Sequence, residues 1–189
     1  MFWNIAALVG VPGVGKTSLS RTAAQELGYK HVNYGELMLE VAQSYELASN
    51  QDEMFCLELE VQQFIWETAA FKLRSICKIH SNVLVDLHGL DSADVGYIVS
   101  LPIEIICPDI IIVVEASYEQ ILDRRISDKT RKRSIDNIKL LKEQMEILRK
   151  AMMACSVVCD CSLKVVDNDD FHHCLNEIKD VLGGHKFYL

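Results

Sequence analysis

The chain has 189 residues, of which 50% are hydrophobic and 24% are charged. This composition excludes fibrous, collagenous and disordered proteins and favours a single domain over residues 1–189. The formal net charge is −8, from 19 Lys and Arg against 27 Asp and Glu, and so acidic a protein is not expected to bind nucleic acids in general.

The predicted elements alternate between strands and helices along the chain. Apolar runs predict strands at 4–9, 30–33, 82–87, 109–115 and 163–166. Apolar residues at spacings of three and four predict helices at 35–48, 52–79, 118–126 and 135–158, with a first helix that stops at Gly28 and a last one that ends near Gly183. This order indicates an α/β fold, with a parallel sheet covered by helices on both faces. Ligands bind such sheets at the carboxyl ends of the strands.

A glycine-rich loop follows the first predicted strand and opens the first predicted helix. Its residues fit the phosphate-loop pattern G-x-x-x-x-G-K-[ST]: Gly10, Val11, Pro12, Gly13, Val14, Gly15, Lys16 and Thr17. Glycines let backbone N–H groups approach phosphates, and the helix N-terminus adds donors and the positive end of its dipole. Lys16 can reach the β- and γ-phosphates, and the Thr17 hydroxyl can ligate Mg²⁺. We therefore predict that ATP binds at this loop.

A carboxylate is expected at the same edge of the sheet. Asp86 closes the buried strand NVLVDL, where a carboxylate would help to hold Mg²⁺ directly or through water. Taken alone, such a residue could equally cap the strand, but beside the phosphate loop we predict the metal role.

A basic segment stands out in this acidic chain. Residues 124–133 hold six cations and one anion, a net charge of +5 that leaves −13 for the rest of the chain. Guanidinium groups stay charged and bind phosphate oxygens bidentately. We therefore predict phosphate contacts from the arginines of this segment, which are Arg124, Arg125, Arg131 and Arg133.

Several further segments occur in an order that is typical of one family. They are VNYGELM at 32–38, DEM at 52–54, VDLH at 85–88, GY at 96–97 with LP at 101–102, and TRKR at 130–133. Together with GVPGVGKTSLS at 10–20, these segments make the chain resemble the archaeal-type adenylate kinases, a branch of the nucleoside monophosphate kinases, over nearly its whole length.

The resemblance implies a fold, a reaction and a set of site residues. The implied fold is a five-stranded parallel sheet of order 2-3-1-4-5, with an AMP-side insertion at about 34–80 and a short lid at about 124–134. The implied reaction is Mg²⁺-dependent transfer of the ATP γ-phosphoryl group to AMP, which gives two ADP. The implied catalytic cations are Lys16, Arg125, Arg131 and Arg133, and Arg124 is placed on ATP. The implied AMP-side residues are Asn33, Tyr34, Gly35 and His88. A homotrimer is also implied.

Two departures from the family fall on the monophosphate side. Relatives tend to carry Arg near the DEM motif, where this chain has Asn50-Gln51 before it and Phe55-Cys56 after it. They also tend to have basic and Thr-Pro residues after D-x-H, where this chain reads GLDS at 89–92. The resemblance therefore leaves the acceptor base open, and a kinase for another monophosphate stays an alternative.

A second branch gives an alternative of another class. The sequence VDLHG at 85–89 also resembles the small nuclear adenylate kinase/ATPase family involved in ribosome assembly. That likeness implies an ATPase that acts with a ribonucleoprotein partner. The two alternatives differ in the acceptor, because a kinase makes ADP in proportion to added AMP.

The remaining signals favour ordinary structural roles. The six clustered residues Cys155, Cys159, Cys161, His172, His173 and Cys174 lack the usual spacing of metal ligands and are expected to be thiols and histidines without metal. No apolar stretch approaches the about 20 residues that a membrane-spanning helix needs, and no leader sequence is recognised. We therefore expect a cytoplasmic protein with reduced cysteines and no membrane partner.

Overall fold

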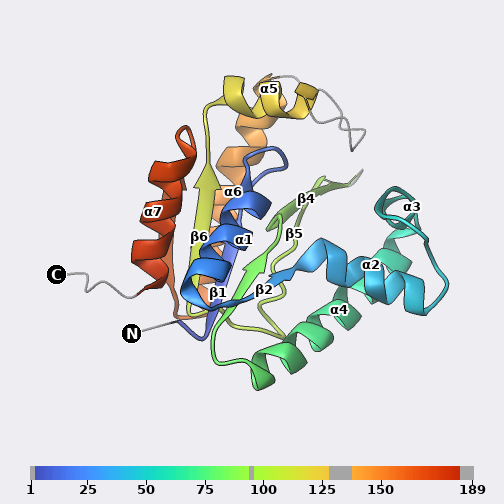
Figure 1. The fold of residues 1–189 in the computed structure, drawn as a ribbon. Coiled ribbons are helices and arrows are strands. Elements are labelled where there is room, and N and C mark those ends of the chain that lie inside the picture. The colour runs from blue at the N-terminus through green and yellow to red at the C-terminus, as the bar shows by residue number, and fades with distance from the viewer. Residues whose placement is uncertain (1–2, 94–95, 128–137, 184–189) are drawn as a thin grey trace.

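The core of the chain is a five-stranded parallel sheet (Figure 1). The computed structural model describes residues 3–93, 96–127 and 138–183. The strands are β1 (Ile5–Val9), β2 (Lys30–Asn33), β3 (Val83–Asp86), β6 (Ile110–Glu115) and β7 (Ser162–Asp167). Their order is β2-β3-β1-β6-β7, which is 2-3-1-4-5 when these five strands are numbered by themselves. The α/β class and the strand order expected from the sequence are confirmed.

The three central strands are almost completely buried because helices cover both faces of the sheet. β1 pairs with β3 on one side, with Ala7 opposite Val85, and with β6 on the other, with Ala7 opposite Ile111. Side chains of β1, β3 and β6 therefore point into apolar surroundings in both directions, which explains why their sequences are continuous apolar runs. All pairings within this sheet run parallel, so the five strands end at one edge.

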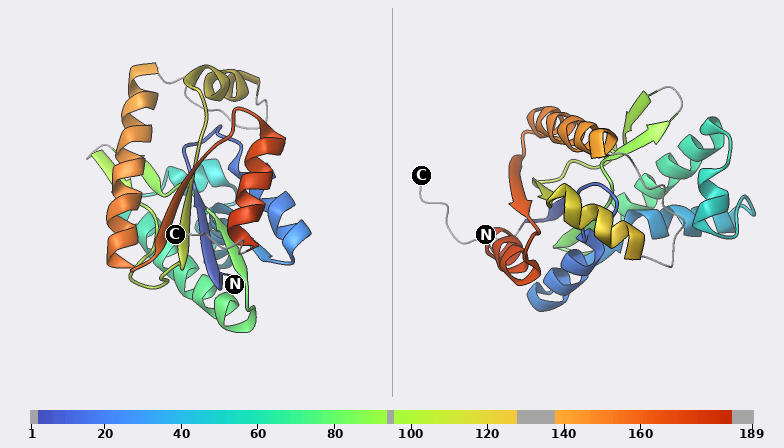
Figure 2. Two further views of the ribbon diagram at one scale, coloured as in Figure 1. Left: turned by 90° about the vertical axis from the view of Figure 1, so that its left-hand side faces the viewer. Right: turned by 90° about the horizontal axis from the view of Figure 1, so that it is seen from above.

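Helices form a layer on each side of the sheet (Figure 2). α1 (Lys16–Leu27) and α7 (Phe171–Leu182) pack against each other on one face, and α6 (Ile138–Val158) covers β6 and β7 on the other. α1 stops at Gly28, which adopts a left-handed conformation and donates its N–H to the Ala24 carbonyl. α5 (Tyr118–Ser127) follows β6 and lies beyond the carboxyl ends of the strands.

A helical group extends from the β2 side of the sheet and differs from the sequence expectation. It consists of α2 (Tyr34–Ser44), α3 (Gln51–Phe55) and α4 (Leu59–Ile79), so the helix expected at 52–79 is in fact two helices. The break lies at 56–58, where the Gln62 side-chain amide donates to the carbonyls of Phe55 and Leu57. These side-chain bonds occupy carbonyls that a continuous helix would have used.

A small hairpin was not expected from the sequence. β4 (Leu90–Ala93) pairs antiparallel with β5 (Gly96–Val99), and Leu90 lies opposite Val99. The Ser100 N–H donates to the Gly89 carbonyl and closes the base of the hairpin. The hairpin therefore begins shortly after the carboxyl end of β3.

The described part of the chain contains no helix that is both long and apolar enough to cross a membrane. Cys155 and Cys174 are buried and Cys159 and Cys161 are partly buried, and within the described ranges all are free thiols. Burial raises the pKa of Cys174 to about 12, so this thiol stays protonated. Across those ranges no cluster of three or more His, Cys, Asp or Glu side chains is arranged to hold a metal ion.

Candidate active site

The loop between β1 and α1 has the backbone of a phosphate-binding loop. Gly13 and Gly15 have φ angles of 92° and 95°, in the left-handed region that favours glycine. A Cβ on Gly15 would lie 2.5 Å from Asn168 Nδ2, so packing as well as backbone conformation requires glycine there. The first turn of α1 then opens at the edge where the parallel strands end, which is where a helix N-terminus can receive an anion.

Lys16 is held inside this loop. Its side chain is buried, with 6% exposed, and Nζ donates to the carbonyls of Gly10 at 2.6 Å and Val11 at 3.3 Å. The ammonium therefore lies among the backbone groups of the loop itself.

Oxygen ligands gather where β2, β3 and α1 meet. Thr17 Oγ1 donates to Asp86 Oδ2 at 2.7 Å, and Asn33 Nδ2 donates to the same oxygen at 3.0 Å. Parallel pairing of β2 and β3 places Asn33 directly opposite Asp86, which explains their contact. Mg²⁺ is commonly held by one or two protein oxygens together with phosphate oxygens and water. The oxygen chemistry of Thr17 and Asp86 fits that ion.

The first two arginines of the basic segment lie against the phosphate loop. Arg124 donates to the Val14 carbonyl at 3.1 Å and to the Asn168 carbonyl at 2.9 Å. The buried Arg125 donates through Nε to the Pro12 carbonyl at 2.9 Å. The structure thus brings both residues to the predicted ATP side, whereas Arg131 and Arg133 lie outside the described residues.

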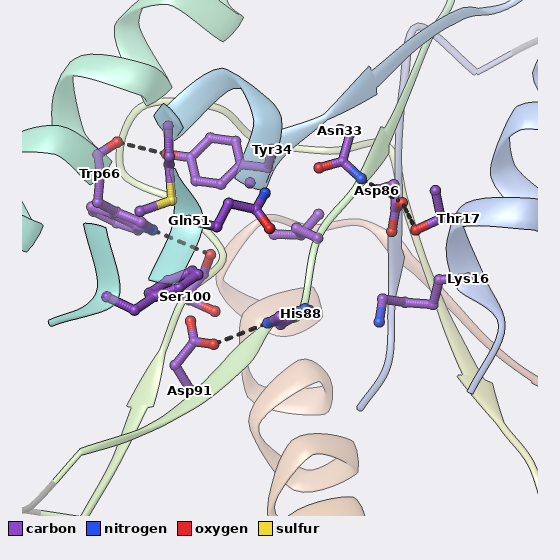
Figure 3. A pocket seen from close by; sticks show the side chains of 14 residues that line it. Lys16, Thr17, Asn33, Tyr34, Gln51, Trp66, Asp86, His88, Asp91 and Ser100 are labelled. Carbon is purple, nitrogen blue, oxygen red and sulfur yellow. Dashed lines mark hydrogen bonds and ion pairs between the residues drawn. The ribbon is translucent and has the colours of Figure 1, made fainter. Parts of the chain in front are cut away.

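A pocket continues from the loop toward the helical group of α2, α3 and α4 (Figure 3). Its lining residues are Lys16, Thr17, Asn33, Tyr34, Gly35, Met38, Gln51, Phe55, Trp66, Asp86, Leu87, His88, Asp91 and Ser100. All four residues that the sequence placed on the AMP side are among them. Figure 3 shows Lys16, Thr17 and Asp86 at one end and Trp66, Ser100 and Asp91 at the other.

At the aromatic end of the pocket the sequence predicted Tyr34 but not Trp66 or Ser100. Trp66 Nε1 donates to the Ser100 carbonyl at 3.4 Å, and the Tyr34 hydroxyl donates to the Trp66 carbonyl at 2.6 Å. Burial raises the pKa of Tyr34, so its hydroxyl stays a neutral donor. The signal that could have found this wall is the pair of departures from the family, because Gln51, Phe55 and Asp91 all line the pocket.

Asp91 and His88 form a pair within the pocket. His88 Nδ1 lies 3.2 Å from Asp91 Oδ1, and the two side chains are 35% and 44% exposed. Burial raises the pKa of Asp91, but hydrogen bonds with His88 and Ser100 and the positive charge of Lys16 outweigh it, and the net pKa is lowered. Asp91 therefore presents a carboxylate to the pocket at neutral pH.

These features define the class of the protein. A parallel sheet of this order, a Gly-Lys-Thr loop after its central strand β1 and a carboxylate at the end of β3 are the elements of a P-loop nucleotide-binding protein. The family comparison agrees, because the AAA_17 family, an AAA domain, matches residues 9–142. In fold the chain is similar to a gluconokinase from Sinorhizobium meliloti, with a TM-score of 0.54 at 15% identity over 94% of this chain and 90% of that one.

Sequence relatives identify the family. An adenylate kinase homolog from Methanothermobacter thermautotrophicus is 42% identical over 87% of this chain and 84% of its own. An adenylate kinase from the same organism is 34% identical over 95% of this chain and 99% of its own. An adenylate kinase from Methanoculleus marisnigri is 34% identical over 90% of this chain and 93% of its own. The chain belongs to the archaeal-type adenylate kinase family, and it is a nucleoside monophosphate kinase.

Proposed function

We propose that the protein transfers the γ-phosphoryl group of Mg·ATP to AMP and forms two ADP. The observation that carries this proposal is the continuity of one pocket from Lys16 and Thr17 of the phosphate loop to Tyr34 and Trp66 at the aromatic end. An acceptor base at the aromatic end would direct its phosphate toward the loop. The adenylate kinase relatives support ATP and AMP as the two substrates.

The ATP side is proposed to act by position and charge. Lys16 would exchange the Gly10 and Val11 carbonyls for phosphate oxygens, and Arg124 and Arg125 flank the loop from α5. Thr17 and Asp86 would hold Mg²⁺, which when bound neutralises phosphate charge that develops during transfer. Arg131 and Arg133 are proposed to act as further catalytic cations on the strength of the sequence.

The AMP side needs no general base for this reaction. A phosphate monoester has a second pKa near 6, so its attacking oxygen is already ionised at pH 7. The task of the pocket is to hold the acceptor in line with the γ-phosphate, which is a matter of positioning. We propose that Asn33, Tyr34, Gly35 and His88 do this, as the resemblance implies.

The proposed reaction is tested by initial rates with Mg·ATP and AMP, CMP or UMP in turn, alongside a reaction without acceptor and one with EDTA. The expected result is ADP formed in a two-to-one ratio to the AMP consumed, with the rate lost on chelation. Phosphate release at the same rate without any monophosphate would contradict the kinase proposal and favour the assembly-type ATPase.

A second set of measurements addresses the proposals that come from the sequence alone. A cytoplasmic homotrimer is proposed from the resemblance, and sedimentation equilibrium would test its stoichiometry. A monomeric mass at micromolar concentration would refute the trimer without affecting the proposed reaction.

A further inference from the structure

The aromatic end of the pocket contains a carboxylate whose place in the reaction is not explained by phosphate transfer. Asp91 lies on β4 and its side chain is 44% exposed. One of its oxygens is engaged by His88 Nδ1 at 3.2 Å, and the Ser100 side chain also bonds to the carboxylate. A carboxylate here would repel an acceptor phosphate, so that phosphate belongs at the opposite end, near Lys16.

The neighbours of Asp91 suit a nucleobase. Trp66, Phe55, Met38 and Tyr34 supply flat or apolar surfaces of the kind on which a base stacks. The Gln51 carboxamide lies nearer the loop end of the pocket, because a Cβ on Gly35 would be 3.5 Å from its Nε2. A base that stacks in this space would therefore present its polar edge to Asp91.

We propose that Asp91 makes the acceptor pocket selective for bases with an amino group at position 6 of a purine or position 4 of a pyrimidine, adenine and cytosine, over bases with a keto oxygen at that position. This inference rests on the proposed function for the existence of an acceptor site. It adds the residue that chooses among acceptors.

The physical reason is the sign of the hydrogen bond. An ionised carboxylate can only accept hydrogen bonds. The 6-amino group of adenine and the 4-amino group of cytosine donate, whereas the corresponding oxygens of guanine and uracil only accept. A keto base in the same orientation would set its oxygen against the carboxylate and lose this hydrogen bond, because two acceptors that face each other cannot bond.

Matched pairs of acceptors test this effect. AMP and IMP differ at position 6 and the adjacent ring nitrogen, and CMP and UMP differ at position 4 and the adjacent ring nitrogen. With Mg·ATP we expect the wild-type kcat/KM to favour AMP over IMP and CMP over UMP by about 10- to 100-fold, the range for a hydrogen bond to a charged group. Asp91→Asn should bring both ratios toward one, because a carboxamide can donate to a keto oxygen.

Asp52→Asn is the matched control, since Asp52 is an exposed carboxylate on α3 outside the pocket. This variant should keep the wild-type ratios. If Asp91→Asn lowers the rate with all four acceptors equally, Asp91 has only a structural role and the inference is overturned. A wild-type protein that treats AMP and IMP alike overturns it as well, without any variant.

Equilibrium dialysis of AMP and IMP against the wild-type protein separates this inference from the proposed reaction. If no monophosphate is phosphorylated, the proposed function fails, but tighter binding of AMP than of IMP would still support base selection by Asp91. Equal binding of the two would reject the selection even if AMP is a good substrate.

Discussion

At the scale of single residues, the clearest prediction concerns Lys16, because its loss should lower activity without disturbing the fold. Its ammonium bonds to carbonyls of its own loop, so we expect its loss to leave the central strands and their pairing unchanged. We expect Lys16→Ala to lower kcat by about 10²–10³-fold or more, because a positioned charge on the transferring phosphoryl group is lost. Steady-state kinetics measure the effect, and far-ultraviolet circular dichroism should be unchanged.

The control for this change is Lys30→Ala, which removes an exposed lysine from β2 without touching the pocket. It should keep kcat within about twofold of wild type, as is usual for a surface substitution away from the site. If Lys16→Ala also keeps its kcat, the phosphate loop does not bind the transferred group and the site is wrongly placed.

The residues near the loop could be predicted from the sequence, but the contact between Trp66 and Ser100 at the far end of the pocket could not. Lys16, Thr17 and Asp86 stand beside strand ends, and parallel pairing brings strand ends to one edge. Trp66 and Ser100 are 34 residues apart and meet only because α4 and the segment after the hairpin pack together. No local pattern encodes that contact, since it arises from tertiary packing.

At the scale of elements, the turn into α1 depends on glycine more strongly than the turn out of it. Gly15 and Gly28 both have positive φ angles, but a Cβ on Gly28 would meet nothing within 4 Å. Alanine in a left-handed conformation costs about 1–2 kcal/mol, so this is the expected loss of unfolding free energy for Gly28→Ala. Gly15→Ala should lose about 1–3 kcal/mol more, because its Cβ would displace the buried Asn168 amide.

Urea unfolding of the two variants measures this difference. Equal losses of unfolding free energy for Gly15→Ala and Gly28→Ala would show that the Asn168 amide can move aside without destabilising the protein. The loop would then tolerate a side chain beside the phosphate site.

The elements that the sequence missed lack the signals on which such predictions depend. The hairpin strand Leu90–Ala93 contains no β-branched or aromatic residue. Its partner Gly96–Val99 does contain Tyr, Ile and Val, but it is mostly exposed and was not recognised as a strand. The break between α3 and α4 contains no Gly or Pro, and the Gln62 side chain donates to the carbonyls of Phe55 and Leu57 at this point. By contrast β1, β3 and β6 are apolar almost throughout because they are buried on both faces, so an apolar run was enough to predict each of them.

At the scale of the whole molecule, the free energy of unfolding should depend on pH through His31. This residue lies on β2, and its Nε2 is 3.0 Å from the Ser20 hydroxyl of α1. Burial lowers the pKa of His31 below its ordinary value of 6.5, although the charge of Asp86 partly opposes this. The unfolded chain therefore binds a proton more readily than the folded one. The stabilisation is fully present above about pH 6.5 and is lost as the pH falls through the lower folded pKa.

The test is urea unfolding at pH 7.5 and 5.5 for the wild type, His31→Gln and His80→Gln. A glutamine amide in place of the imidazole can still bond to Ser20 but cannot take up a proton, so His31→Gln should lose less stability between the two pH values than the wild type. His80→Gln changes an exposed residue at the end of α4 and should match the wild type. Asp91, whose pKa is lowered from 3.8, titrates below this interval. An identical pH dependence in all three proteins would show that burial of His31 contributes nothing to the loss of stability on acidification.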